Sequence, residues 1–130
     1  MKGPQDLLDV ARSVRERAHC PYSKYAVGAA LRTREGAIYA GANVENACYP
    51  LGLCAERSAV VSAVSAGEHS FEEILVITRD GGSPCGACRQ VLREFGEDLR
   101  IWIASDAGIL RQHQLSDLLP DSFGPDNLLP

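Results

Sequence analysis

Three cysteines and one carboxylate define the chemistry that this sequence could perform. Cys54 is followed two residues later by Glu56, and Cys85 and Cys88 lie further along the chain. Three thiolate ligands leave one position of a tetrahedral zinc ion open, which distinguishes catalytic zinc sites from structural ones. A zinc ion in such a site lowers the pKa of a bound water towards neutrality and presents it as hydroxide. We therefore predict one zinc ion per chain, with Glu56 moving the protons.

Both cysteine motifs open a helical pattern. The sequence predicts helices over 54–66 and over 84–95, each ended by a glycine, and the second has Pro84 at its start. All three cysteines should then lie in first helical turns, where free N–H groups and the helix dipole favour thiolates. Cys85 and Cys88 share a helix face, as two ligands of one ion must.

Glu56 and Arg57 should support this site from the first of these helices. Glu56 lies on a different stripe of the helix from Cys54, so it reaches the metal only if the helix points at the metal end-on. Arg57 is expected to donate hydrogen bonds to sulfur and to offset the negative charge of the thiolates.

Spacing alone leaves a second interpretation of the cysteines open, which is a structural zinc site with four protein ligands. The fourth ligand would then come from His19, Cys20, Cys48, His69 or His113. Outside such a site, Cys20 and Cys48 are expected to be small buried hydrophobic residues.

The composition indicates one globular domain spanning residues 1–130. The net charge is −4 and no lysine–arginine cluster is present, which argues against nucleic acid as a partner. No apolar stretch approaches the roughly 18–20 residues that a membrane span needs, and no signal pattern opens the chain. An odd number of cysteines, five, favours reduced thiols, so we expect a cytoplasmic protein.

Strand and helix patterns alternate along the chain. The remaining predicted elements are a helix over 4–18, a hairpin of strands 27–31 and 37–44, a loop over 45–53, strands 74–77, 101–104 and 109–110, and a short helix over 116–119. This alternation predicts an α/β fold whose sheet is covered by helices on both faces. Ligands of such sheets gather where strands end and helices begin, and the cysteines lie at two such places.

The sequence resembles the zinc-dependent cytidine deaminases, specifically their small homotetrameric class with three cysteine ligands. The resemblance covers nearly the whole chain and includes the Pro-Cys-x-x-Cys signature of zinc deaminases. The segments that carry it are Asn43-Val44-Glu45-Asn46-Ala47-Cys48-Tyr49-Pro50-Leu51-Gly52-Leu53-Cys54-Ala55-Glu56-Arg57 and Pro84-Cys85-Gly86-Ala87-Cys88-Arg89-Gln90-Val91, with shorter matches over 21–25 and 118–125.

The resemblance implies a three-layer α/β/α sandwich with a five-stranded mixed sheet and one zinc ion per subunit on Cys54, Cys85 and Cys88. It also implies hydrolytic deamination of free cytidine and 2′-deoxycytidine, in pyrimidine salvage. Glu56 would take a proton from the attacking water, give it to ring N3 and later help protonate the leaving amine.

The same resemblance implies contacts to the substrate. Asn43 and Glu45 match residues that hold the sugar hydroxyls, and alternation along a strand would turn both to one side. A carboxylate accepts a hydrogen bond from a hydroxyl and repels a phosphate, so free nucleosides should be preferred over nucleotides. Further contacts, partly across a subunit boundary, would come from Val44, Asn46, Ala47, Cys48 and Tyr49.

Two aromatic residues complete the expected pocket. Tyr25 occupies a position where the family often has a phenylalanine that packs against the base, and its added hydroxyl needs a partner if it is buried. Phe123, in the C-terminal tail 120–130, resembles an aromatic residue that covers a neighbouring subunit's pocket, although core packing would also explain an aromatic residue there. A homotetramer would then be required for a complete site.

Two other functions compete with this one. A deaminase of a cytosine-bearing antibiotic such as blasticidin S shares the zinc motifs, but the segment 43–49 argues against it. A non-catalytic zinc-stabilised binding module, for example one that binds RNA, is disfavoured by the lack of a basic face.

Overall fold

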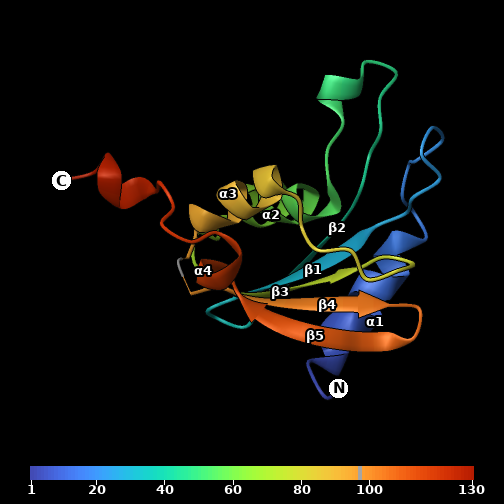
Figure 1. Cartoon of the computed structure of the whole chain (residues 1–130), viewed down its shortest axis with the longest axis horizontal. Helices are drawn as coiled ribbons and strands as arrows, with labels where there is room; N and C mark the ends of the chain where they lie inside the picture. The colour runs from blue at the N-terminus through green and yellow to red at the C-terminus, as the bar shows by residue number, and fades with distance from the viewer. Residues whose placement is uncertain (97) are drawn as a thin grey trace.

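A five-stranded mixed sheet, in the order β2-β1-β3-β4-β5, lies at the centre of the computed structural model (Figure 1). The structure describes residues 1–96 and 98–130. β3 and β4 are parallel, and the other neighbouring strands are antiparallel. The strands are β1 Gly28–Thr33, β2 Ile38–Ala42, β3 Phe71–Ile77, β4 Arg100–Ser105 and β5 Gly108–Gln114.

Helices cover both faces of the sheet (Figure 1). One face carries α1, and the other carries α2, α3 and α4. The predicted three-layer α/β/α architecture is therefore confirmed. The helices are α1 Gln5–Arg15, α2 Ala55–Ser65, α3 Gly86–Arg93 and α4 Leu115–Leu118, with 3-10 helices at Tyr49–Leu51 and Pro125–Asn127. Among the described residues, no helix has the length and apolar character needed to cross a membrane.

The central strands are apolar on both sides because both sides are covered. In β3, Ile74 and Val76 face the layer of α2 and α3, whereas Leu75 and Ile77 pack against α1. This alternation with a period of two residues explains why the run appears as continuously apolar in the sequence.

Several predicted boundaries were wrong, among them the ends of α1, β2 and β5. α1 ends at Arg15, not at residue 18, and β2 ends at Ala42, not at residue 44. β5 extends to Gln114, far beyond the predicted 109–110, because its polar residues pair with β4. Backbone pairing to a neighbouring strand does not require apolar side chains, so the sequence pattern shows only the apolar part of this strand.

A glycine in β2 sets the position of α2. A Cβ atom at Gly41 would lie 2.3 Å from the backbone nitrogen of Ala59 and 2.7 Å from the carbonyl oxygen of Ala55. Only a residue without a side chain allows helix and strand backbones to approach this closely. This contact fixes the start of α2, and with it Cys54 and Glu56, against the sheet.

Candidate metal centre and active site

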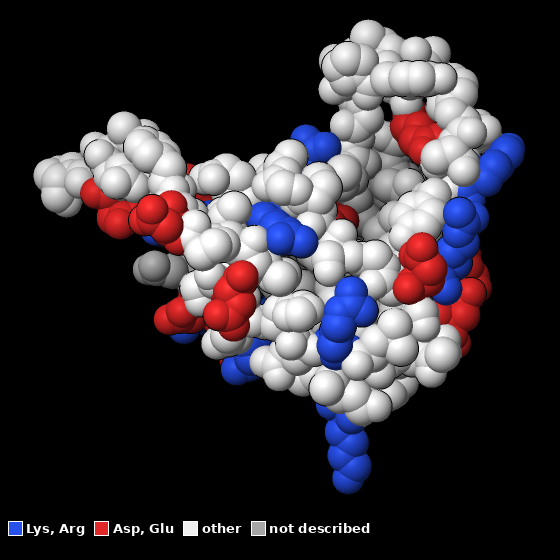
Figure 2. All heavy atoms as spheres, in the orientation of Figure 1, with Lys and Arg blue, Asp and Glu red and all other residues white. Residues whose placement is uncertain are grey.

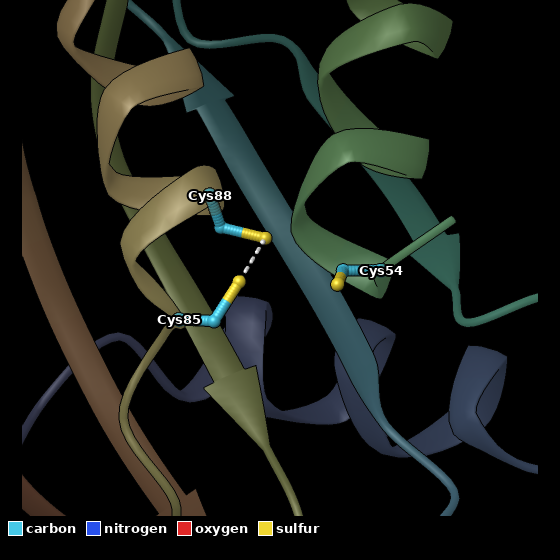
Figure 3. A group of neighbouring side chains, drawn as sticks. All are labelled: Cys54, Cys85 and Cys88. Carbon is cyan, nitrogen blue, oxygen red and sulfur yellow. Dashed lines mark hydrogen bonds between the residues drawn. The ribbon is translucent and has the colours of Figure 1, made fainter. Parts of the chain in front are cut away.

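α2 and α3 direct their N-termini towards a common point (Figure 3). Cys54 is the N-cap residue of α2, Cys85 is the N-cap residue of α3, and Cys88 follows in the first turn of α3. Cys54 and Cys85 thus stand just before their helices, one position outside the predicted first turns. Unpaired N–H groups and the helix dipole favour negatively charged sulfur at all three positions.

The three sulfur atoms are close enough to share one metal ion. Their Sγ atoms all lie within 4.8 Å of one another, and those of Cys85 and Cys88 are 3.5 Å apart. Zinc bonds sulfur at about 2.3 Å, so tetrahedral ligands should be separated by about 3.8 Å. Among the described residues, this group contains only the three cysteines, and no side chain considered above as a fourth structural ligand belongs to it. The cluster could hold one zinc ion with a coordination position left open.

Arg57 places a positive charge beside the sulfurs. Its guanidinium donates a hydrogen bond to Cys54 Sγ over 3.5 Å. Hydrogen bonding by Cys88, and then by Arg57, lowers the pKa of Cys54 to about 5, whereas the interaction with Cys54 raises the pKa of Cys88. Within the described part of the chain, Arg57 Nε is buried without a hydrogen-bond partner. A donor left free beside thiolates suits a site that carries excess negative charge, as three thiolates on a divalent ion do.

Glu56 is buried beside this cluster, with 5% of its surface exposed. Burial, followed by repulsion from the Cys54 thiolate, raises the pKa of Glu56 to about 7. A carboxyl group with a pKa near neutrality can both accept and release a proton in water, which is what general acid–base catalysis requires.

A cavity of about 280 Å³ lies over the cluster. Cys54, Cys85 and Glu56 form part of its wall, and three of the predicted substrate contacts, Tyr25, Asn43 and Glu45, form another part. The cavity therefore brings the cysteine cluster and Glu56 together with the side chains of Tyr25, Asn43 and Glu45.

Asn43 and Glu45 both hold the segment that precedes β1. The Asn43 side chain accepts from the Val27 N–H and donates to the Tyr25 carbonyl oxygen, each over 2.9 Å. Glu45 accepts from the N–H groups of Tyr22 and Ser23, at 3.0 and 3.1 Å, and from the Ser23 hydroxyl. A carboxylate offers about four acceptor positions and an amide two donors and two acceptors, so both side chains keep capacity for a ligand.

The other predicted contacts lie outside this cavity in their own chain. Asn46 and Tyr49 line a neighbouring cavity of about 370 Å³, which Glu45 and Ser23 also border. Val44, Ala47, Cys48 and Phe123 are exposed. The structure does not bring these four to the lining of either cavity.

Sequence reasoning missed three polar residues of the cavity wall, Ser23, Thr78 and Ser83. Thr78 directly follows β3, and Ser83 lies between β3 and α3. Their place after the carboxyl end of a parallel strand was the available signal, since ligands gather there. Ser23 left no such signal.

The family model described as the cytidine and deoxycytidylate deaminase zinc-binding region matches residues 1–104. The chain belongs to this family. It is similar to a cytidine deaminase of Sporosarcina psychrophila, with 40% identity over 127 residues that cover 95% of this chain and 93% of the relative.

Two solved structures share the fold. A crystal structure of cytidine deaminase from Burkholderia pseudomallei has a TM-score of 0.89 and 42% identity. The match covers 94% of this chain and 100% of the Burkholderia chain. A crystal structure of cytidine deaminase from Mycobacterium tuberculosis has a TM-score of 0.81 and 37% identity, covering 92% of this chain and 96% of that one. Together with the cysteine cluster, these relationships identify a zinc-dependent deaminase of the hydrolase class.

Proposed function

We propose that this protein hydrolyses free cytidine and 2′-deoxycytidine to uridine and 2′-deoxyuridine with release of ammonia. The observation that carries this proposal is that the cluster of three sulfurs adjoins one cavity, whose wall includes Cys54, Cys85, buried Glu56, Asn43 and Glu45. Cytosine-specific chemistry needs an activated water and a proton carrier at the same place. Relatives named cytidine deaminase, similar over nearly the whole chain, support the substrate class.

Glu56 would transfer protons between the attacking water and the substrate. Zinc, when held by Cys54, Cys85 and Cys88, would supply the Lewis acidity that makes a water acidic near neutral pH. Glu56 takes a proton from the water that attacks C4 and delivers it to ring N3. Glu56 then takes the remaining proton of the hydroxyl on C4 and passes it to the exocyclic amine N4, the C4–N4 bond breaks to leave the C4 carbonyl, and one water has been exchanged for one ammonia. Burial keeps bulk water away from this transfer.

Asn43 and Glu45 would hold the sugar. Both border the cavity, and both retain hydrogen-bonding capacity beyond their contacts to the 22–27 segment. The Ser23 hydroxyl, which donates to Glu45, lowers the pKa of that carboxyl, so it is ionised at neutral pH. An ionised carboxylate accepts from a sugar hydroxyl and repels a phosphate, which favours nucleosides over nucleotides.

Assembly into a homotetramer would complete the pocket. The segment 43–53 and the C-terminal tail project from the body on either side of α2 and α3 (Figure 1). Both projections expose large apolar side chains, for example Tyr49 at 74% and Phe123 at 58%. Exposed apolar groups of this size suit contact with other subunits. We place Phe123 over the cavity of a neighbouring subunit, with residues 1–130 forming one domain.

The cellular setting proposed for this reaction is pyrimidine salvage in the cytoplasm. All five cysteines are free thiols, which suits a reducing compartment. On the face drawn in Figure 2, basic and acidic side chains are interspersed. Such a surface suits a small nucleoside substrate better than a polyanionic nucleic acid.

An ultraviolet assay of cytosine loss tests the proposal. Cytidine and 2′-deoxycytidine should both be converted with release of ammonia, and their 5′-phosphates should react at least tenfold more slowly. Glu56→Gln should keep fold and zinc but lose at least about 10²-fold in kcat, the usual contribution of a general acid–base. A protein that ignores both nucleosides, or a fully active Glu56→Gln variant, would refute the proposal. Blasticidin S is assayed as a third substrate, and its turnover in preference to cytidine would favour the antibiotic deaminase alternative.

A further inference from the structure

A hydrogen bond joins the loop after β3 to the segment before β1. The Tyr25 hydroxyl donates to Asp80 Oδ1 over 2.6 Å, and the two residues are 55 positions apart in the sequence. Tyr25 lines the cavity, as do Gly82 and Ser83 from the same loop. The bond therefore links two walls of the cavity that the chain builds from distant segments.

The loop is folded to present Asp80 to this tyrosine. The Thr78 hydroxyl oxygen accepts from the N–H groups of Gly81 and Gly82, at 2.8 and 2.9 Å, and the same hydroxyl donates to Asp80 Oδ1 over 3.1 Å. A Cβ atom at Gly82 would lie 2.8 Å from the Tyr25 hydroxyl oxygen. The tight turn and the missing side chain thus make room for the tyrosine and hold the carboxylate that receives it.

Tyr25 is fixed at its backbone as well as at its hydroxyl. Its N–H donates to the Ser23 hydroxyl oxygen over 3.0 Å, and its carbonyl oxygen accepts from Asn43 over 2.9 Å. The Arg79 guanidinium carbon lies over the ring, 5.0 Å from the centroid. Because Arg79 covers one face, the ring offers the cavity its other face or its edge. The hydrogen bond to Asp80 restrains the remaining rotation about the side-chain torsions.

We propose that Asp80 is a positioning residue for the nucleoside, because it holds the Tyr25 ring as a rigid wall of the substrate cavity. The inference rests on the proposed function, since the ligand is the proposed substrate. Without the hydrogen bond, substrate binding must itself order the ring, and this entropy cost weakens binding. The chemical step depends on Glu56 and the cysteine cluster, so the effect falls on KM and not on kcat.

Steady-state kinetics with cytidine test this assignment in the zinc-loaded protein. Asp80→Ala and Tyr25→Phe should each raise KM about three- to tenfold, the effect of one hydrogen bond to an exposed charged group, with kcat within about twofold of wild type. Asp80→Asn keeps an acceptor oxygen and should restore KM to within about twofold. Tyr39→Phe removes the hydroxyl of a tyrosine that packs against the core from β2, and should leave KM unchanged.

The double variant Tyr25→Phe/Asp80→Ala should have the KM of Tyr25→Phe, because the same bond is lost in both. A KM unchanged in Tyr25→Phe, or a KM raised equally in Asp80→Asn and Asp80→Ala, would overturn the positioning role while wild-type deamination still supports the proposed function. A fall in kcat alone would also overturn it. A wild-type protein without deaminase activity would overturn the proposed function and this inference together.

Discussion

Arg57 is the residue that we expect to link charge balance to metal binding. Its guanidinium contacts Cys54 Sγ at 3.5 Å, and its buried Nε has no partner within the described residues. Three thiolates carry more negative charge than one divalent ion neutralises. A fixed cation beside them offsets the excess and so stabilises the site. Arg57 directly follows Glu56 in α2, so the start of this helix brings together Cys54, the proposed proton carrier Glu56 and a positive charge.

Replacing Arg57 with glutamine should weaken zinc binding about 10- to 100-fold, the range found when groups that orient or support metal ligands are removed. The physical reason is the loss of positive charge and hydrogen bonding at Cys54. Competition with a chromogenic chelator measures the affinity. Arg12→Gln, an exposed change in α1, is the control and should leave zinc binding unaltered. Equal zinc affinity in the Arg57 variant and in wild type would show that the guanidinium does not support the metal.

At the level of secondary structure, the contact of β2 with α2 decides where the helix that carries Glu56 lies. Gly41→Ala should lower the free energy of unfolding by about 1–3 kcal/mol, the usual cost of overpacking, because its Cβ would meet backbone atoms that cannot rotate away. It should also reduce kcat, since α2 carries Glu56. Urea unfolding and deaminase assays check the two effects.

Gly96→Ala is the matched control, because its Cβ would make only an ordinary contact at 3.5 Å with the Phe71 carbonyl oxygen. It should change the free energy of unfolding by less than about 0.5 kcal/mol. Similar destabilisation by both alanines would mean that glycine flexibility, and not the close approach of β2 and α2, sets the effect.

Glu73 ties three strands together under the α1 layer. Only 7% of its surface is exposed, and its carboxylate accepts from Arg32 Nε at 2.8 Å and Trp102 Nε1 at 2.9 Å. Burial by itself raises the pKa of Glu73, but the hydrogen bonds from Arg32 and Trp102 outweigh it and lower the pKa. The folded state therefore prefers the ionised form. This stabilisation is complete above the carboxyl's usual pKa and is lost as the pH falls through the lowered folded value.

Glu73→Gln should consequently lower the free energy of unfolding by about 1–3 kcal/mol at pH 7, as expected for lost hydrogen bonds to a buried charge. The difference in free energy of unfolding between variant and wild type should become smaller as the pH falls below about 4. Urea unfolding across this range measures it. Glu72→Gln, at a half-exposed ion pair with Arg100, should cost at most about 0.5 kcal/mol. A difference in free energy of unfolding that stays constant with pH would show that the ionised carboxylate of Glu73 is not the cause of the destabilisation.

The sequence predicts the elements and the cysteine cluster because their signals are local. Apolar runs mark β3 and β4, and proline and glycine mark the helix that carries Cys85 and Cys88. The length of β5 could not be predicted, since its polar residues form part of the strand through backbone pairing with β4. The hydrogen bond between Tyr25 and Asp80 could not be predicted either, because no local sequence pattern indicates a contact between side chains 55 positions apart.

For the whole molecule, the decisive feature is that a cavity on the body and an aromatic ring on the tail are separated within one chain. Gln90 on α3 holds the tail by donating to the Phe123 carbonyl oxygen over 2.9 Å, yet the Phe123 ring stays exposed. A tail anchored at its backbone with a free aromatic side chain suits insertion into a neighbouring subunit. The proposed homotetramer would then hold sites built from two chains.

Subunit mixing tests this sharing. Phe123→Ala should lower kcat/KM about tenfold or more, the effect of losing an aromatic contact to a base, and Glu56→Gln should be inactive. Mixed tetramers, formed by unfolding and refolding the variants together, should exceed the summed activities, because some sites combine an intact Glu56 with a neighbour's intact Phe123. Mixing Glu56→Gln with Cys54→Ser should give no gain, since both changes fall in one chain's share of the site. Absence of gain in the first mixture, or a fully active monomer in sedimentation, would show that each chain completes its own pocket.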